Sequence, residues 1–264
     1  MPIPTDRKSA GLASLRRRII ETAAHASEGH IPSALSVLDI LWVLYDRVLS
    51  VDPAAPQAED RDRFVLSKGH ASLGLYVVLA EKGFIPVEAL KTFCTYDSIL
   101  GGHPDSNKVP GVEASSGSLG HGFPMAVGMA LGARIRALPS KVFCLIGDGE
   151  SNEGSIWEGA LLAAHHGLEN LCCIVDYNHS TDRALALGDI GAKFAAFGWL
   201  VREVDGHDHD ALHAALTGAS DGRPLCVVAN TIKGYGCAPL ENEPAWHHKA
   251  PTSAELPQLL SVVS

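Results

Sequence analysis

The sequence has no excess of basic residues: 21 Lys and Arg stand against 30 Asp and Glu in 264 residues, which gives a formal net charge of -9. No stripe of Lys and Arg is present that could displace the counterions of a phosphate backbone, so a nucleic-acid-binding protein is disfavoured. An anionic ligand would therefore have to be held locally, by a metal ion, by backbone amides or by a few of the 13 histidines.

The chain also lacks a CxxC pair and any long hydrophobic run. Four of its six cysteines lie in short apolar segments that indicate buried strands, which favours a reducing, cytoplasmic compartment. The adjacent Cys172 and Cys173 would point to opposite faces of a strand, so we interpret them as core residues. Residues 1–9 lack the apolar part of a signal peptide, and no stretch reaches the length of a membrane span. We expect a cytoplasmic protein that is neither exported nor bound to a membrane.

Apolar residues recur at helical spacing in the first third of the chain, from Leu12 to Ala23 and from Ser36 to Leu49. Beyond this point, short apolar strands alternate with helical segments. The strands are expected at 64–66, 142–146, 171–175, 199–204 and 225–229, and the helices at 73–80, 125–137, 156–166, 191–197 and 211–216. This alternation predicts an α/β fold, a doubly wound, mainly parallel sheet with helices on both faces. Ligands bind such sheets at the carboxyl ends of the strands.

No repeat, low-complexity segment or internal boundary divides the sequence, so we expect a single domain over residues 1–264. It would have a helical segment at its N-terminus and a C-terminal tail, after Tyr235, that wraps over the surface. The stretch 101–118 is rich in Gly, Pro and Ser and too long for a plain connector, which makes it either functional or disordered. A doubly wound nucleotide-binding domain is disfavoured because no GxGxxG turn follows the first strand.

The most specific motif is Gly147-Asp148-Gly149, directly after the strand at 142–146, with Asn178 following the next strand. The three residues alone would fit a simple strand-to-helix corner. Together with Asn178, they place a carboxylate and an amide oxygen at the tips of neighbouring strands. These two ligands, a backbone carbonyl, two diphosphate oxygens and one water would complete the octahedron that Mg²⁺ prefers. The glycines allow close approach to the phosphates, and the helix that follows can offer amides to them.

The stretch from Gly147 to Glu158 resembles the cofactor-binding segment of the transketolase family, in its N-terminal, diphosphate-binding region. Further segments resemble the family in the same order, namely Glu28-Gly29-His30, Leu66-Ser67-Lys68-Gly69-His70-Ala71, Gly102-His103-Pro104, Ser116-Gly117-Ser118-Leu119-Gly120, Ile232-Lys233-Gly234-Tyr235-Gly236 and Trp246-His247. The resemblance spans nearly the whole chain. It implies the thiamine diphosphate-binding fold of the PP type, with thiamine diphosphate and Mg²⁺ as cofactors.

The resemblance also implies a role for individual residues. Mg²⁺ would be bound by the side chains of Asp148 and Asn178 and by the backbone carbonyl of Ser180. The implied cofactor-binding set comprises His70, Gly117, Leu119, Gly147, Asp148, Gly149, Glu153, Asn178 and His247. Within this set, Gly117 and Leu119 would pack beside the cofactor rings, and Glu153 would lie between two active sites.

The implied catalytic residues are His30, His103 and His247, and the first two would face the substrate. Imidazoles titrate near neutrality and can pass the protons that ketol cleavage requires. Seven other histidines are interpreted as structural or solvated: His25, His165, His166, His179, His207, His209 and His213.

By resemblance, the reaction is the transfer of a two-carbon ketol unit from a ketose, phosphorylated or similarly anionic, to an aldose. In the family, the catalytic glutamate lies in a pyrimidine-binding domain that follows the region matched here. We therefore expect the N-terminal subunit of a split transketolase, active only with a C-terminal partner subunit in an α2β2 heterotetramer.

Two alternatives were weighed, the α subunit of a 2-oxo acid dehydrogenase and a non-catalytic cofactor-binding remnant. The histidine set argues against the first, and the intact ligand residues argue against the second. Departures from the family pattern at Ile31-Pro32-Ser33, Ser118 and His121 lie in loops on the substrate side, and they leave the identity of the sugar open.

Overall fold

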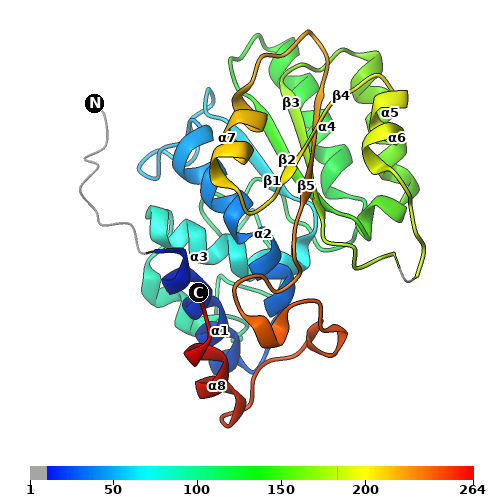
Figure 1. Cartoon of the computed structure of the whole chain (residues 1–264). Coiled ribbons are helices and arrows are strands. Elements are labelled where there is room, and N and C mark those ends of the chain that lie inside the picture. Colours follow the sequence, from blue (N-terminus) through cyan, green and yellow to red (C-terminus); the bar gives the residue numbers. More distant parts are fainter. Residues whose placement is uncertain (1–10, 183) are drawn as a thin grey trace.

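A computed structural model describes residues 11–182 and 184–264 and shows five strands in one sheet, all parallel (Figure 1). The strands are β1 (Arg63–Leu66), β2 (Val142–Gly147), β3 (Leu171–Tyr177), β4 (Leu200–Asp205) and β5 (Leu225–Asn230). They pair in the order β1-β2-β3-β5-β4. The predicted α/β fold is confirmed, and each expected strand is present.

Helices pack on both faces of this sheet. One side carries α1 (Leu12–Ala26), α2 (Ile31–Val43), α3 (Ser72–Lys82) and α7 (His209–Thr217), and the other carries α4 (Gly122–Ile135), α5 (Gly154–His165) and α6 (Ile190–Ala196) (Figure 1). A hydrophobic core lies between the sheet and each of these two groups of helices. Because successive side chains of a strand point to opposite faces, Cys172 lies in the core with α1, α2, α3 and α7, and Cys173 lies in the core with α4, α5 and α6. Both are buried free thiols, which confirms their interpretation as core residues.

The second helix begins earlier than its apolar pattern predicts. Helix α2 starts at Ile31, not near Ser36, and Pro32 lies in its first turn. The amides of a first turn have no acceptor within the helix, so the missing amide hydrogen of proline costs no helical hydrogen bond there. After Val43 the chain continues as a wider π-helical turn over Leu44–Val48. Every residue of α2 is buried, so its sequence has no polar face to mark where the helix begins.

The segment after Tyr235 does more than wrap over the surface. It contains the short helix α8 (Glu255–Ser261), which packs against α1, and its Leu259 is buried in the same core as α1 and α2. Pro257 argues against a helix in the sequence, but a proline is tolerated in a first turn. The C-terminal segment therefore contributes to the core.

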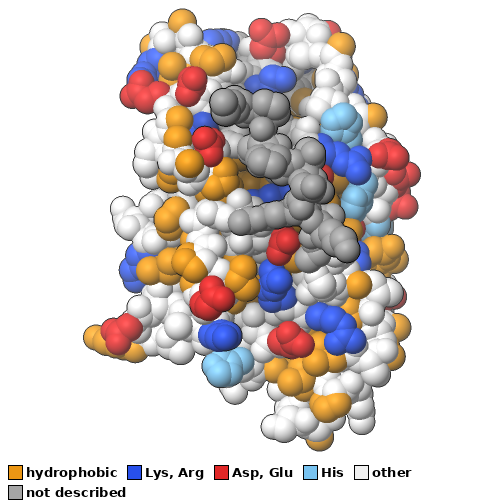
Figure 2. All heavy atoms as spheres, turned by 90° about the vertical axis from the view of Figure 1, so that its left-hand side faces the viewer, with side chains coloured by type: hydrophobic (Ala, Val, Ile, Leu, Met, Phe, Trp, Pro, Cys, Tyr) orange, Lys and Arg blue, Asp and Glu red, His pale blue; other side chains and the backbone are white. Residues whose placement is uncertain are grey.

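Residues 1–9, where we expect no signal peptide, lie outside the described residues. Among the described helices, none combines the length and the apolar character that crossing a bilayer requires. On the face shown in Figure 2, the described Lys and Arg side chains are interspersed with Asp and Glu, without gathering into a basic stripe.

Candidate active site

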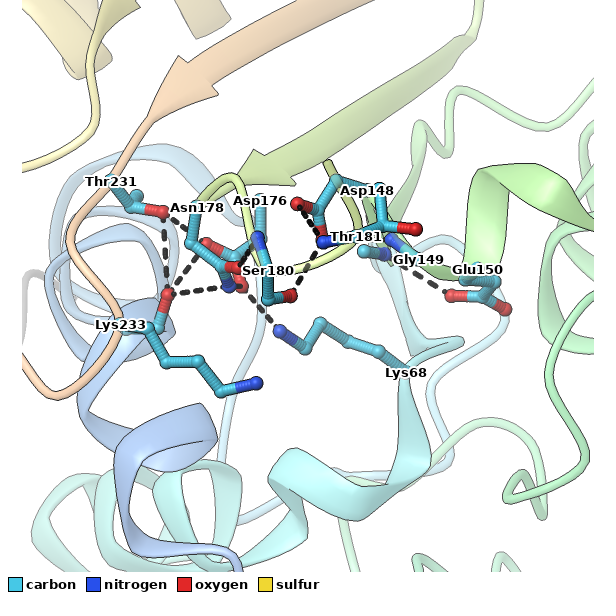
Figure 3. A network of polar contacts seen from close by, with 12 residues as sticks. Lys68, Asp148, Gly149, Glu150, Asp176, Asn178, Ser180, Thr181, Thr231 and Lys233 are labelled. Carbon is cyan, nitrogen blue, oxygen red and sulfur yellow. Dashed lines mark hydrogen bonds and ion pairs between the residues drawn. The ribbon is translucent and has the colours of Figure 1, made fainter. Parts of the chain in front are cut away.

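A buried polar network lies at the carboxyl ends of β1, β3 and β5 (Figure 3). Its centre is Asp176, which is fully buried and pairs with the ammonium of Lys68. Asp176 also accepts hydrogen bonds from Ser36 Oγ, at 2.7 Å, and from Thr231 Oγ1. Burial alone would raise the pKa of Asp176, but the Lys68 ammonium and the hydroxyl donors lower it below its usual value. The carboxylate is therefore charged and fixed in place.

This carboxylate orients Asn178. The Asn178 Nδ2 donates to Asp176 Oδ2 at 2.9 Å and to Ser36 Oγ at 3.2 Å, and its Oδ1 accepts from the Ser180 amide at 3.1 Å. Asp148 Oδ1 in turn accepts from Ser180 Oγ at 3.1 Å. The structure thus brings together the three predicted metal ligands, Asp148, Asn178 and Ser180, which come from the ends of two neighbouring strands.

These residues fit Mg²⁺ and a diphosphate. One carboxylate, one amide oxygen and one peptide carbonyl are hard oxygen donors of the kind that Mg²⁺ takes. A Cβ atom placed on Gly147 would lie 3.7 Å from Lys68, and one on Gly149 would lie 3.9 Å from Thr181, which are ordinary contacts. The packing of this chain therefore does not itself require glycine at either position, which is compatible with a role of these glycines toward a ligand.

Glu150 is a further buried carboxylate at this site, beside Asp148 and Asp176, and no role was predicted for it from the sequence. Its side chain accepts hydrogen bonds from Ser67 Oγ and from the amides of Gly120, at 2.9 Å, and Gly147, at 3.2 Å. Burial raises the pKa of Glu150. The residue joins three segments of the predicted site that are far apart in sequence. Glu150 lies within the stretch Gly147 to Glu158 that resembles the family, but nothing in the sequence reveals its hydrogen-bond partners.

Three of the predicted histidines gather around a separate pocket. His30, His70 and His103 line one pocket of about 150 Å³ together with Glu28 and His248. The ring centroids of His30 and His70 are 5.3 Å apart. The loop 101–118 therefore contributes His103 to this pocket, which agrees with the interpretation of the loop as functional and not with its interpretation as disordered.

His103 is held by its surroundings. Gly117, with φ of 151°, lies against the ring, and a Cβ atom there would be 3.0 Å from the ring carbon Cδ2. The hydroxyl of Tyr76 donates to the His103 carbonyl oxygen at 3.0 Å. Gly117 thus contacts His103 within this chain, and its predicted packing beside the cofactor rings stays a prediction.

A larger pocket of about 640 Å³ lies next to the first and is lined by Asn178, Ser180, Lys233 and His247. Lys233 Nζ is 3.0 Å from His247 Nδ1, and the His247 ring centroid is 5.5 Å from that of His30. His247 therefore stands between the two pockets. Burial and the nearby charge of Lys68 lower the pKa of Lys233.

Lys68 and Lys233 lie in two of the segments that resemble the family, but no role is predicted for them from the sequence. Figure 3 shows their side chains extending toward each other beside Asn178. Two largely buried ammonium groups beside oxygen ligands form a cationic site in an acidic protein. Such a site suits an anion that is bound together with a metal ion.

Two further predicted residues lie at the edge of the site. Leu119 is half-buried, and Glu153 is exposed at the N-cap of α5, where it packs closely against Gly120. Their predicted contacts, to the cofactor rings and between two active sites, involve groups outside this chain and stay predictions.

The protonation state of the histidines differs from the sequence-based expectation. Burial, followed by the charges of His248 and His247, lowers the pKa of His30 to about 4. Burial and the Lys68 ammonium lower the pKa of His70 to about 2, and burial and Lys233 lower the pKa of His247. The expectation that the imidazoles titrate near neutrality is therefore wrong for His30 and His70. Near pH 7 they are neutral imidazoles that can both donate and accept hydrogen bonds.

This burial predicts a pH dependence of stability. Between its ordinary pKa of 6.5 and the folded value of about 4, His30 binds a proton in the unfolded chain but not in the folded one, and His70 behaves in the same way. The free energy of unfolding should therefore fall as the pH drops through this window. Urea unfolding at about pH 7 and about pH 5 should show a smaller difference for the double variant His30→Asn/His70→Asn than for the wild type.

The exposed His25 provides the control for this measurement, because His25→Asn should leave the acid-induced loss of stability as it is. A double variant whose unfolding free energy depends on pH as strongly as that of the wild type would contradict the assignment.

Comparison with known proteins places this geometry in a family. The family described as "Transketolase, thiamine diphosphate binding domain" matches residues 8–260. The chain is 42% identical over 250 residues to an apulose-4-phosphate transketolase subunit from Actinobacillus succinogenes, and the match covers 92% of this chain and 91% of that protein. It is 39% identical over 241 residues to the 6-deoxy-6-sulfo-D-fructose transketolase subunit SqwG of a Clostridium species, covering 89% and 88% of the two chains.

Solved transketolases share the fold and are longer. The enzyme from Leishmania mexicana superposes with a TM-score of 0.87 at 28% identity, over 95% of this chain and 41% of that one. The enzyme from Campylobacter jejuni gives a TM-score of 0.85 at 33% identity, over 90% and 40%. This chain thus spans well under half of those enzymes, but most of the subunits named above. From its sequence, its fold and the arrangement of its site, the chain belongs to the transketolase family and corresponds to the family's thiamine diphosphate binding domain.

Proposed function

We propose that this chain is the N-terminal subunit of a two-chain transketolase that transfers a two-carbon ketol unit from a ketose to an aldose. One observation carries the proposal: the oxygen ligands at Asp148 and Asn178 lie beside a cationic pocket that adjoins a pocket lined by histidines. When bound, thiamine diphosphate supplies the carbanion-stabilising chemistry that breaking and remaking the C–C bond requires.

In this proposal the larger pocket holds the charged end of the cofactor. Asp148, Asn178 and the Ser180 carbonyl bind Mg²⁺, and Lys233 contributes a positive charge toward the diphosphate. Neutral His70 and His247 donate hydrogen bonds to its oxygens. The protein as a whole is acidic, so binding depends on this local set of cations and donors.

The smaller pocket would hold the reacting end of the sugar. His30 and His103 face this space from two different loops, and as hydrogen-bond partners they can orient the hydroxyl groups and the carbonyl oxygen of a ketose. A volume of about 150 Å³ accommodates only part of a sugar phosphate. We propose a phosphorylated or similarly anionic ketose whose distal end lies outside this pocket, against the partner chain.

A partner is part of the proposal. Two relatives bear names that denote subunits, and the solved enzymes extend far beyond the region matched here. Helices α4 and α5 expose the apolar side chains of Met125, Leu161 and Leu162. An exposed apolar surface of this kind is typical of protein contacts. We infer a C-terminal transketolase subunit that carries the pyrimidine-binding domain and the catalytic glutamate, in an α2β2 heterotetramer.

The test is a ketol-transfer assay on the complex of this chain with the C-terminal subunit, supplied with thiamine diphosphate and Mg²⁺. Candidate donors should include phosphorylated and sulfonated ketoses, and the released aldehyde should be quantified by coupled reduction. Transfer that depends on both cofactors supports the proposal. Decarboxylation of 2-oxo acids by the complex, without ketol transfer, would instead support a 2-oxo acid dehydrogenase α subunit. A complex that binds the cofactor but catalyses neither reaction would point to a non-catalytic remnant.

The proposed contacts of His70 and His103, which line the same pocket, predict different effects for the two histidines. His103→Ala should lower kcat by about tenfold to hundredfold while thiamine diphosphate affinity is retained, because its proposed contact is to the sugar. His70→Ala should weaken cofactor affinity first and recover much of its turnover when the cofactor is saturating. Steady-state rates measured against thiamine diphosphate concentration separate the two effects.

The control for this pair is His25→Ala, at an exposed position in the last turn of α1. It should leave both parameters unchanged. Equal cofactor affinities for the His70 and His103 variants would show that the proposed division of roles between these two histidines is wrong.

A further inference from the structure

Two glycine-containing turns interlock at the carboxyl ends of β4 and β5. They are Asp205-Gly206-His207 and Lys233-Gly234-Tyr235-Gly236. A Cβ atom on Gly206 would collide with Thr231, and one on Gly234, which has φ of 87°, would collide with the Leu240 carbonyl oxygen. The ring of His207 stacks on that of Tyr235, with centroids 3.5 Å apart. The packing of the two turns therefore depends on glycines at these positions.

The hydrogen bonds of His207 determine its tautomer. Its Nε2 is 2.9 Å from the amide of Ile232, and its Nδ1 is 3.0 Å from Asp39 Oδ2. Because a backbone amide can only donate, Nε2 must be the unprotonated nitrogen, and the proton lies on Nδ1 and is donated to Asp39. His207 thus connects a carboxylate of α2 to the backbone beside Lys233. The sequence-based interpretation of His207 as structural or solvated did not include this connection.

Asp39 is itself rigidly held. It is 2% exposed, pairs with Arg16 of α1 at 3.0 Å, and contacts His209 Nε2 at 2.9 Å. Burial would raise the pKa of Asp39, but the hydrogen bond from His207 and the charge of Arg16 lower it. Ser36, one turn earlier in α2, donates to the central carboxylate of the metal-binding network. Helix α2 therefore supports both that network and His207.

The backbone is fixed on both sides of Lys233. His207 accepts from the Ile232 amide before it, and the Pro32 carbonyl oxygen accepts from the Gly234 amide after it, at 3.0 Å. We propose that His207 is a positioning residue that holds this backbone so that the Lys233 ammonium faces the diphosphate pocket. The inference rests on the proposed function, because it assigns Lys233 to the cofactor diphosphate.

Two substitutions separate the contacts of His207. The amide of His207→Gln reaches the place of Nε2 and can still accept from Ile232, whereas the shorter His207→Asn keeps only the donor to Asp39. Both remove the stack on Tyr235 and each keeps one of the two hydrogen bonds, so the difference between them compares the bond to Ile232 with the bond to Asp39. His209→Gln is the control, since His209 contacts the same carboxylate and has no bond to the 231–236 segment.

The experiment has two readouts on the full chain. Amide hydrogen exchange of residues 231–236 measures how firmly the backbone is held, and titration of the complex with thiamine diphosphate at fixed Mg²⁺ measures affinity. We expect faster exchange and about tenfold weaker cofactor affinity in His207→Asn than in His207→Gln, with similar kcat at saturating cofactor. His209→Gln should match the wild type in both.

If both His207 variants bind thiamine diphosphate with equal affinity, and the wild-type complex binds it normally, the positioning role of His207 is overturned and the proposed function is not. Faster exchange in His207→Asn with unchanged affinity would also overturn it, because Lys233 would then act independently of this backbone. A wild-type complex that fails to bind thiamine diphosphate would instead overturn the proposed function, and the inference with it.

Discussion

Replacing Asp148 with alanine should abolish Mg²⁺-dependent binding of thiamine diphosphate by the assembled enzyme. Asp148 is the only charged member of the proposed ligand set, and Asn178 and the Ser180 carbonyl lie beside it. Without it the metal loses one of two side-chain ligands, and the diphosphate meets an acidic protein with its counter-ion weakened. Loss of an outer partner of a metal site already costs about 10- to 100-fold in affinity, so loss of a direct ligand should exceed that range.

Isothermal calorimetry of the complex with thiamine diphosphate, at fixed Mg²⁺, measures this effect. Asp182→Ala is the matched control, because Asp182 lines the same pocket and, among the described side chains, its carboxylate bonds only to the exposed His179, at 2.9 Å. It should bind the cofactor as the wild type does. Since Asp148 is buried, thermal unfolding should be recorded for each variant. A folded Asp148→Ala complex with wild-type cofactor affinity would refute the metal assignment.

The sheet and the placement of the proposed metal ligands were predictable because the relevant signals are local. Strands β2 and β3 are buried on both faces, so they appear in the sequence as unbroken apolar runs. A polar residue directly after such a run lies at the carboxyl edge of the sheet. Asp148 and Asn178 could therefore be placed together from the sequence, and the structure brings them to the same edge with Ser180.

The rest of the site depends on contacts between distant segments. Asp176 follows an apolar run like many strand-end residues, yet its partners Ser36, Lys68 and Thr231 come from three other parts of the chain. The same holds for Glu150 and for the bond between His207 and Ile232. No periodicity or spacing in one sequence reports which of these segments meet.

The protonation states of the histidines could not be predicted from the sequence either. An imidazole is expected to titrate near neutrality unless its burial is known, and the burial of His30 and His70 arises only when the loops fold over one another. A sequence can show that histidines belong to a site, but their protonation follows from packing. For this protein, that packing changes their proposed role from proton carriers to hydrogen-bond partners.

The purified chain alone should show no ketol transfer and should bind thiamine diphosphate weakly, whereas addition of the C-terminal subunit should restore both. In the proposed function, the described residues would supply oxygen ligands, cations and histidines for the diphosphate and for one end of the sugar. In the family's solved enzymes this region makes up about two fifths of the chain, 41% in the example from Leishmania mexicana. The proposed glutamate that activates the aminopyrimidine would come from the partner.

The size of this effect follows from what is missing. General acid–base assistance is typically worth about 10²- to 10⁴-fold in rate. A cofactor that is gripped only at its diphosphate would also expose its reacting ring to water, which weakens the electrostatic stabilisation of the transition state. The two losses together place the lone chain near the background rate. The apolar side chains on α4 and α5 would be exposed as well, which favours assembly when the partner is added.

The measurement is ketose-dependent release of aldehyde, first by the isolated chain and then at increasing ratios of the C-terminal subunit. Activity should rise from background and level off at a fixed stoichiometry, and analytical ultracentrifugation at that point should report the size of an α2β2 assembly. Mass spectrometry of the isolated chain must show that no partner has been carried through purification, since a trace would mimic intrinsic activity. Substantial turnover by a preparation that passes this check would mean that the chain needs no second subunit.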